Sequence, residues 1–143
     1  MPPTDRRLNV CLIGIILGLL LVGFVSGTPL RHVVQVLPAC IVLVALRRGA
    51  SWGPYAAYAI FSFWLLIMTL IWLHLLGLVH LITGNFSTIE IILTIFIAGW
   101  CLLGIIRVSF AGKPAIRILG FLSFALLQIA ALWLSMQPYL SHR

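Results

Sequence analysis

The side chains best suited to chemistry gather at one end of the apolar segments of this chain. Arg31, His32 and Gln35 fall within about two turns of one segment, and spacings of three and four residues place side chains on one helical face. His74 and Glu90 belong to other segments but share the same expected depth. Ionisable side chains inside a membrane are costly and tend to mark sites. These five residues therefore predict a polar patch that binds a ligand or a partner.

A structural interpretation of the same residues stays open. Arg31 and Glu90 carry opposite charges at similar depth, so we expect them to interact. Both also lie within a turn of a helix end, where the cost of a charge is small and a long side chain reaches the interface. Ser87 and Glu90 have the spacing of a capping box, which explains Glu90 without a ligand. The position of these residues favours the structural interpretation.

Histidines on separate segments raise the alternative of a haem protein. Axial histidines from two helices at matched depth can hold a haem, and His32 with His74 or His80 would be the candidates. His74 and His80 are six residues apart and so face different sides of a helix. Hydrogen bonding of these histidines to neighbours or water is the simpler expectation. Gln128, near the middle of the last segment, is a candidate polar contact at the membrane midplane.

The residues give no catalytic constellation. Asp5 and Glu90 are the only carboxylates, and they are too far apart in the expected topology to form a pair. No nucleophile-elbow motif is present. The three cysteines have no metal-ligand spacing and lie inside apolar segments, as buried thiols do: Cys11, Cys40 and Cys101. We assign no catalytic residue and no metal site, and the interpretation leans away from an enzyme.

The composition predicts the elements that carry these residues. Of 143 residues, 63% are hydrophobic and 8% are charged, with a mean hydropathy of +1.22. Soluble domains carry about 25% charged residues, and a spanning helix needs roughly 20 apolar ones. We expect an all-α integral membrane protein, one transmembrane domain without a soluble part, with five spans near 8–26, 29–46, 54–78, 88–106 and 115–135.

The basic residues predict the orientation. With the N-terminus in the cytoplasm, the inside carries seven basic residues and the outside carries only Arg31 and Arg143, which follows the positive-inside rule. This predicts an N-in, C-out protein of the plasma membrane, bacterial inner membrane in type. The start of the chain also resembles a cleaved signal peptide ending near Ser26, but its apolar run is longer than usual. The seven inner residues are Arg6, Arg7, Arg47, Arg48, Arg107, Lys113 and Arg117.

Proline and glycine add local expectations. Thr28 and Pro29 suit the cap and first position of the second helix, and Pro38 should kink it. The third segment could run to Ile82, which is too long for a core of about 30 Å. We expect it to tilt, to break near Gly77, or to project from the outer surface.

Small residues predict close helix packing. Gly14 and Gly18 have the small-x-x-x-small spacing that lets two helices approach closely. The spacing fits packing within the chain as well as association between chains, so both remain open.

The leading functional expectation is a non-catalytic membrane component. It would be an accessory or structural subunit of a membrane complex, or a self-assembling protein, with other membrane chains or its own copies as partners. A small transporter or channel, and a haem- or quinone-binding redox protein, are the alternatives. No cofactor is indicated, although bound lipid is expected. The basic residues form no stripe with interleaved aromatics, which argues against nucleic acid.

Overall fold

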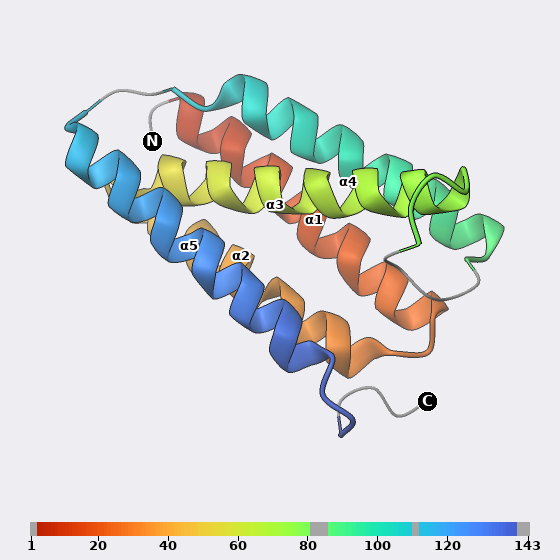
Figure 1. Ribbon diagram of the computed structural model, residues 1–143. Helices are drawn as coiled ribbons and strands as arrows, with labels where there is room; N and C mark the ends of the chain where they lie inside the picture. Colours follow the sequence, from red (N-terminus) through yellow and green to blue (C-terminus); the bar gives the residue numbers. More distant parts are fainter. Residues whose placement is uncertain (1–2, 81–85, 110–111, 140–143) are drawn as a thin grey trace.

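The five expected segments are helices in the structure. The computed structural model describes residues 3–80, 86–109 and 112–139, and every regular element within them is an α-helix (Figure 1). All five helices are long and apolar enough to cross a membrane. Arg143 and the possible extension of the third segment to Ile82 lie outside the described residues. The helices are α1 (Pro3–Val25), α2 (Pro29–Arg47), α3 (Gly53–Leu75), α4 (Thr88–Arg107) and α5 (Pro114–Ser135).

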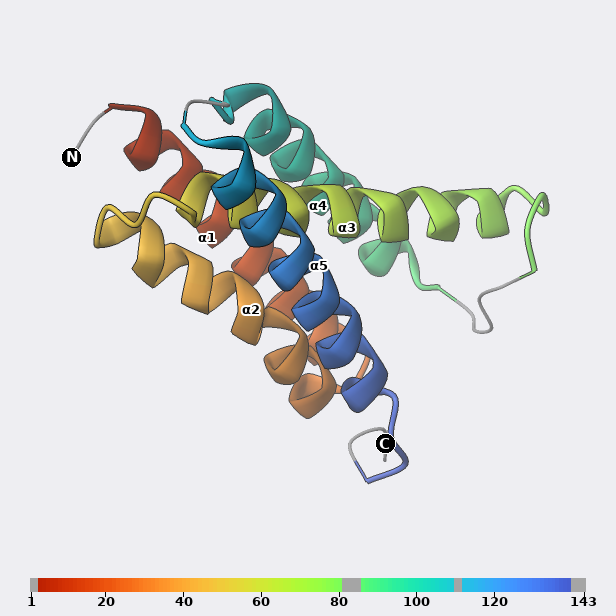
Figure 2. The ribbon, with the colours of Figure 1, turned by 60° about the vertical axis from the view of Figure 1, so that its left-hand side comes forward.

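The helices run alternately up and down, and their contacts form a ring. α1 packs between α2 and α4, while α3 contacts α2, α4 and α5, and α5 also lies along α2. No contact joins α4 to α5 or α1 to α5 within the described residues. The helices diverge at one end, where the C-terminus of α3 and the N-terminus of α4 lie away from the N-terminus of α2 (Figures 1 and 2). We call this the outer end, following the sequence-based orientation, and the opposite end the inner end.

Close packing in the middle of the bundle depends on glycine. A Cβ atom added to Gly14 would lie 2.5 Å from the Trp100 ring, and one added to Gly18 would lie 2.6 Å from Ile97. A Cβ on Gly104 would similarly lie 2.5 Å from the ring of Phe61, which is completely buried. The Gly14-x-x-x-Gly18 face is therefore used within the chain, where it brings α1 against α4.

The capping box at the start of α4 is confirmed. The Ser87 backbone N–H donates to Glu90 Oε2 at 2.7 Å, and the Glu90 N–H donates to Ser87 Oγ at 3.3 Å. Two of the amide groups that an α-helix leaves unpaired at its N-terminus are thus satisfied.

The prediction of a capping hydrogen bond from Thr28 at the start of α2 is wrong. Thr28 does occupy the N-cap position, with Pro29 following it, but its side chain accepts no hydrogen bond from the helix backbone. Thr28 Oγ1 lies 2.7 Å from Ser26 Oγ instead. The tight turn through Gly27 (φ +70°) brings the two hydroxyl groups together, and this pairing replaces the cap.

A pair of alanine substitutions tests this difference between the two caps. Ser87→Ala removes a side-chain acceptor from the start of α4 and is expected to lower the free energy of unfolding by about 1 kcal/mol. Thr28→Ala removes no such acceptor, so it should lower the free energy of unfolding clearly less than Ser87→Ala does. Thermal unfolding of both variants in the same detergent measures the difference, and equal losses would contradict the assignment.

The third helix ends where glycine allows the chain to turn. α3 stops at Leu75, and Gly77 adopts φ +73°. The Leu78 N–H then donates to the Leu73 carbonyl at 2.9 Å, which is the bond that closes a Schellman motif. The break expected near Gly77 is therefore present, and it shortens the helix to a length that one bilayer core accommodates.

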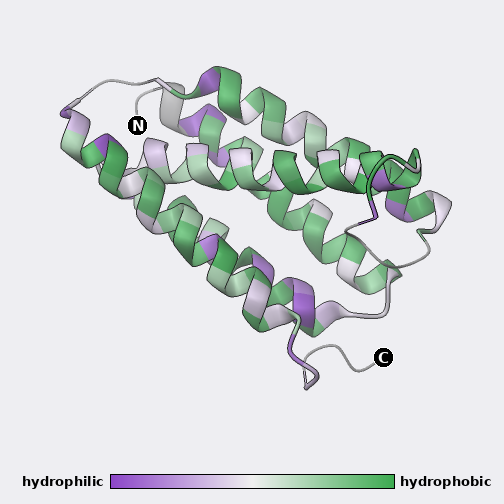
Figure 3. Ribbon diagram, in the orientation of Figure 1, coloured by the Kyte–Doolittle hydropathy of each residue, from purple (hydrophilic) through white to green (hydrophobic). Residues whose placement is uncertain are grey.

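The two last helices leave most of their surface uncovered. Half of the spanning stretch of α1 is buried in the bundle, against 22% for α4 and 17% for α5. Hydrophobic residues cover the length of the helices, whereas hydrophilic residues concentrate near their ends (Figure 3). An apolar surface of this extent needs lipid or a partner to cover it. Its exposed members include Ile92, Ile95, Leu102 and Ile106 of α4 and Leu119, Leu122, Leu126, Ile129 and Trp133 of α5.

Candidate functional site

His32 is held inside the turn that joins α1 to α2. Its Nδ1 lies 3.1 Å from the Thr28 carbonyl oxygen, so this nitrogen carries the proton and donates it. The Thr28 hydroxyl lies 3.4 Å from the same nitrogen. Gly23 of α1 packs directly against the histidine, because a Cβ there would lie 2.8 Å from His32 Cβ. His32 thus fixes the geometry of the turn.

Arg31 and Glu90 form no ion pair in the structure. The Glu90 carboxylate is engaged by Ser87 in the α4 cap, where Oε2 also accepts from Ser87 Oγ at 2.8 Å. Both charges lie within electrostatic range of His32. Arg31 is half-buried, and its Nε is a buried atom with no hydrogen-bond partner. The direct interaction expected between Arg31 and Glu90 is therefore absent.

A second polar group joins α2 to α5. Gln35 Nε2 donates to Ser135 Oγ at 2.9 Å, and Ser135 Oγ donates to the Leu132 carbonyl at 2.6 Å. Gln128 is completely buried, and its Nε2 donates to the Gln35 carbonyl at 3.1 Å. This carbonyl is next to that of Val34, which Pro38 leaves without its intrahelical donor. Gln128 Oε1 is buried without a partner.

The third group surrounds the end of α3. His74 Nδ1 donates to the Val79 carbonyl at 3.1 Å, and the His74 ring meets the edge of Phe86 at a centroid distance of 6.4 Å. His80 is exposed. These residues lie at the end of α3 that diverges from the start of α2 (Figures 1 and 2). His32 and His74 thus have separate hydrogen-bond partners, one in the turn before α2 and one after the end of α3.

The residues of the expected outer patch therefore have separate partners: His32 packs on α1, Gln35 bonds to α5, and His74 bonds to the turn after α3. His32 and Gln35 are three residues apart, an offset of about 60° around a helix. That offset is enough to direct His32 to α1 and Gln35 to α5. In the described part of the chain, no group of three His, Cys, Asp or Glu side chains could hold a metal ion. No known protein family, curated protein or solved structure matches this chain.

Two partners in these contacts were not singled out from the sequence. Ser135 accepts from Gln35, and Thr94 Oγ1 accepts from Trp72 Nε1 at 2.9 Å, which links α3 to α4. Ser135 has the same expected depth as Gln35, so matching polar residues by depth would have found it. Thr94 gives no comparable signal, because threonine in a membrane helix commonly satisfies itself by donating to its own backbone, as Thr94 also does to Ile91.

Most polar side chains among the described residues bond within their own helix or turn, and three hydrogen bonds join different helices: Gln35 to Ser135, Trp72 to Thr94 and Gln128 to the Gln35 carbonyl. Each of the three groups bonds to a neighbouring helix, to a turn or to its own backbone. Cys11 and Cys101 are buried and Cys40 is half-buried, and all three are free thiols. These contacts leave the apolar faces of α4 and α5 uncovered in the described part of the chain.

Proposed function

We propose that this chain is a non-catalytic membrane component that crosses the plasma membrane five times, with its N-terminus in the cytoplasm. It associates with other membrane chains, or with copies of itself, through the uncovered faces of α4 and α5. It acts as an accessory or structural subunit and needs no cofactor for this role.

The orientation is supported by where the fold gathers positive charge. Seven basic residues lie at or beside the inner helix ends, which are the starts of α1, α3 and α5 and the ends of α2 and α4. In the described part of the outer end, Arg31 is the only arginine or lysine. Packing supports retention of α1 in the mature protein, because Leu8, Leu12, Ile15 and Leu19 belong to the core and their removal would leave it open.

The way α5 is attached carries the proposal of a partner. Its buried residues are Gly120, Gln128 and Ser135, so α5 buries small and polar side chains and keeps its large apolar ones outside. α4 and α5 are neighbours in sequence, yet they share no contact. Helices surrounded by lipid gain little free energy from burying apolar side chains against each other. Their association is instead favoured by close packing at small residues.

Small residues on the uncovered faces point the same way. Gly99 of α4 is exposed, and a Cβ added there would meet nothing within 4 Å. Ser123 and Ala130 are exposed on α5. These positions allow the backbone of another helix to approach closely. In contrast, the small residues on α1 are already occupied by the chain's own side chains.

A photo-crosslinking amino acid placed on these faces tests the proposal. At Leu102 of α4 or Leu126 of α5, crosslinking in native membranes should give a discrete protein adduct, identified by mass spectrometry of the purified band. Leu37 of α2, which is comparably exposed, provides the control and should give lipid adducts only. Lipid adducts at all three positions, together with a monomeric mass in mild detergent, would contradict the proposal.

A further inference from the structure

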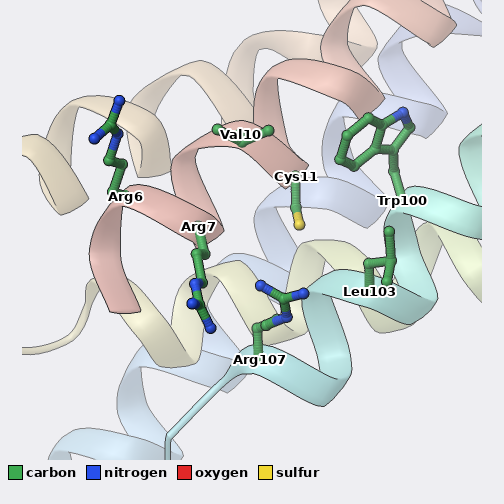
Figure 4. A pocket seen from close by; sticks show the side chains of 7 residues that line it. All are labelled: Arg6, Arg7, Val10, Cys11, Trp100, Leu103 and Arg107. Atoms are coloured by element: carbon green, nitrogen blue, oxygen red, sulfur yellow. The ribbon is translucent and has the colours of Figure 1, made fainter. Parts of the chain in front are cut away.

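At the inner end, the side chains of α1 and α4 leave a cavity between the two helices. Its volume is about 430 Å³, and it lies between the start of α1 and the end of α4 (Figure 4). Arg7 from α1 and Arg107 from α4 reach into the space between the two helices, and Arg6 lies on the outer side of the same turn. The other lining residues are Val10, Cys11, Trp100 and Leu103.

The walls of the cavity are apolar, and the charged residues lie at its inner end. α1 and α4 are antiparallel, so the arginines lie at the mouth and Trp100 lies two turns deeper, about 10 Å along the helix axis from Arg107. Val10 and Leu103 form the wall between them. A ligand that fits this order has a charged head and an apolar tail, and it lies parallel to the helices.

The charge at the mouth is uncompensated within the described residues. None of the three guanidinium groups has a hydrogen bond or an ion pair to a described protein group, and all three side chains are exposed. The chain has two carboxylates, of which Glu90 lies at the opposite end and the Asp5 side chain lies outside the description. Like charges brought together by two helices repel each other unless an anion lies between them.

We propose that this cavity binds one anionic phospholipid of the inner leaflet, with the phosphodiester between Arg7 and Arg107 and an acyl chain along Val10, Leu103 and Trp100. Guanidinium groups bind phosphate oxygens in a bidentate manner, which favours arginine at such a site. Basic pockets between helices on the cytoplasmic side suit anionic headgroups. A zwitterionic lipid fits less well, because its own amine neutralises the phosphate. The inference rests on the membrane insertion and orientation proposed above, but not on a protein partner.

Binding is measured with the full-length protein purified in a neutral detergent. Phosphatidylglycerol and phosphatidylcholine of the same chain length are titrated separately, and native mass spectrometry counts the bound lipids. The proposal predicts one phosphatidylglycerol bound well before any further ones and no comparable step with phosphatidylcholine. Inorganic phosphate is added in a third arm. If phosphate alone displaced the lipid at low millimolar concentration, the site would be an anion site and the lipid proposal would be overturned.

A matched pair of variants separates the cavity from general surface charge. Arg7→Gln with Arg107→Gln should weaken the first phosphatidylglycerol step about thirtyfold, since each arginine near an anionic headgroup contributes about a factor of five. Arg47→Gln with Arg48→Gln removes the same charge from the same end of the bundle outside the cavity, and should leave that step unchanged. Equal weakening in both pairs would overturn the proposal.

The folded state of the variants is controlled independently of lipid. Circular dichroism and gel filtration in detergent report whether the double variant keeps the native bundle. If it does not, Arg107→Gln alone is measured, with an expected fivefold weakening. Photo-crosslinking at Leu126 of α5 lies outside this site, so failure of the lipid inference and failure of the partner proposal give different results.

Discussion

Replacement of Gly14 by valine is expected to lower the free energy of unfolding by about 3 kcal/mol, because the new side chain would enter space occupied by the Trp100 ring. The Cβ atom alone would lie 2.5 Å from that ring, and Trp100 is packed between α1 and α4. The helices must move apart or the ring must leave its place. Unfolding titrations of the purified protein in mixed micelles with increasing sodium dodecyl sulfate give the difference in free energy.

Gly99→Val is the matched control for this prediction. It makes the same change in α4, and no atom lies within 4 Å of the added Cβ. Both substitutions alter helix propensity equally, so the difference between them isolates the packing of α1 on α4. Removal of the opposing ring with Trp100→Ala should recover part of the loss in the Gly14→Val background. Equal stability of the two valine variants would mean that α1 and α4 do not meet as described.

Phe61→Ala is expected to have the second-largest effect, a loss of about 2 to 3 kcal/mol. Phe61 is completely buried at the centre of α3, and its ring lies against Gly104 of α4. In a membrane, moving the ring from the core to lipid changes its solvation free energy little. The loss of stability therefore comes from the cavity that the substitution leaves and from the contacts that the ring no longer makes. The same detergent titration measures it.

Phe24→Ala is the control for the second prediction. Phe24 is 72% exposed near the end of α1, so lipid replaces the contacts that its ring loses. The variant should differ from the wild type by less than about 0.5 kcal/mol. If Phe24→Ala were as destabilising as Phe61→Ala, the distinction between core and lipid-facing surface drawn from the structure would be wrong.

The sequence was most informative where chemistry marks a helix end. Ser87 and Glu90 gave the start of α4, and Gly77 gave the end of α3, since few residue types satisfy a capping box or a positive φ. Thr28 shows the limit of such signals. A threonine before proline is a good cap, but the Thr28 hydroxyl group forms a hydrogen bond with Ser26, two residues earlier, instead. Competition of this kind depends on the path of the preceding turn.

Helix faces were much harder to predict than helix ends. In a soluble protein the polar side of a helix faces water, so the opposite, apolar side is known to be buried. A membrane helix is apolar all round, and this signal is lost. Nothing in the sequence therefore indicated that Gly14 faces Trp100 or that Gly99 faces outward. The arginines of the inner cavity were recognised only as determinants of orientation, since the packing of α1 beside α4 is what brings Arg7 and Arg107 together.

The polar residues illustrate the same limit within one helix. Arg31, His32 and Gln35 were expected to form a single patch because their spacing fits one face. The helices around α2 divide that face, so His32 contacts α1 and Gln35 contacts α5. Spacing predicts which side chains are near one another on a helix, and the neighbouring helices decide which of them act together.

Cysteine labelling in intact cells tests the five-span, N-in arrangement most directly. Single substitutions are made at Ser51 and Ser109 on the inner side and at His80 and Gln137 on the outer side, and the native chain gives the background. A membrane-impermeant maleimide should label the cysteines at positions 80 and 137 in intact cells. It should reach those at 51 and 109 only after permeabilisation. Labelling of both groups from outside, or the reverse pattern, would contradict the topology on which the partner and lipid proposals depend.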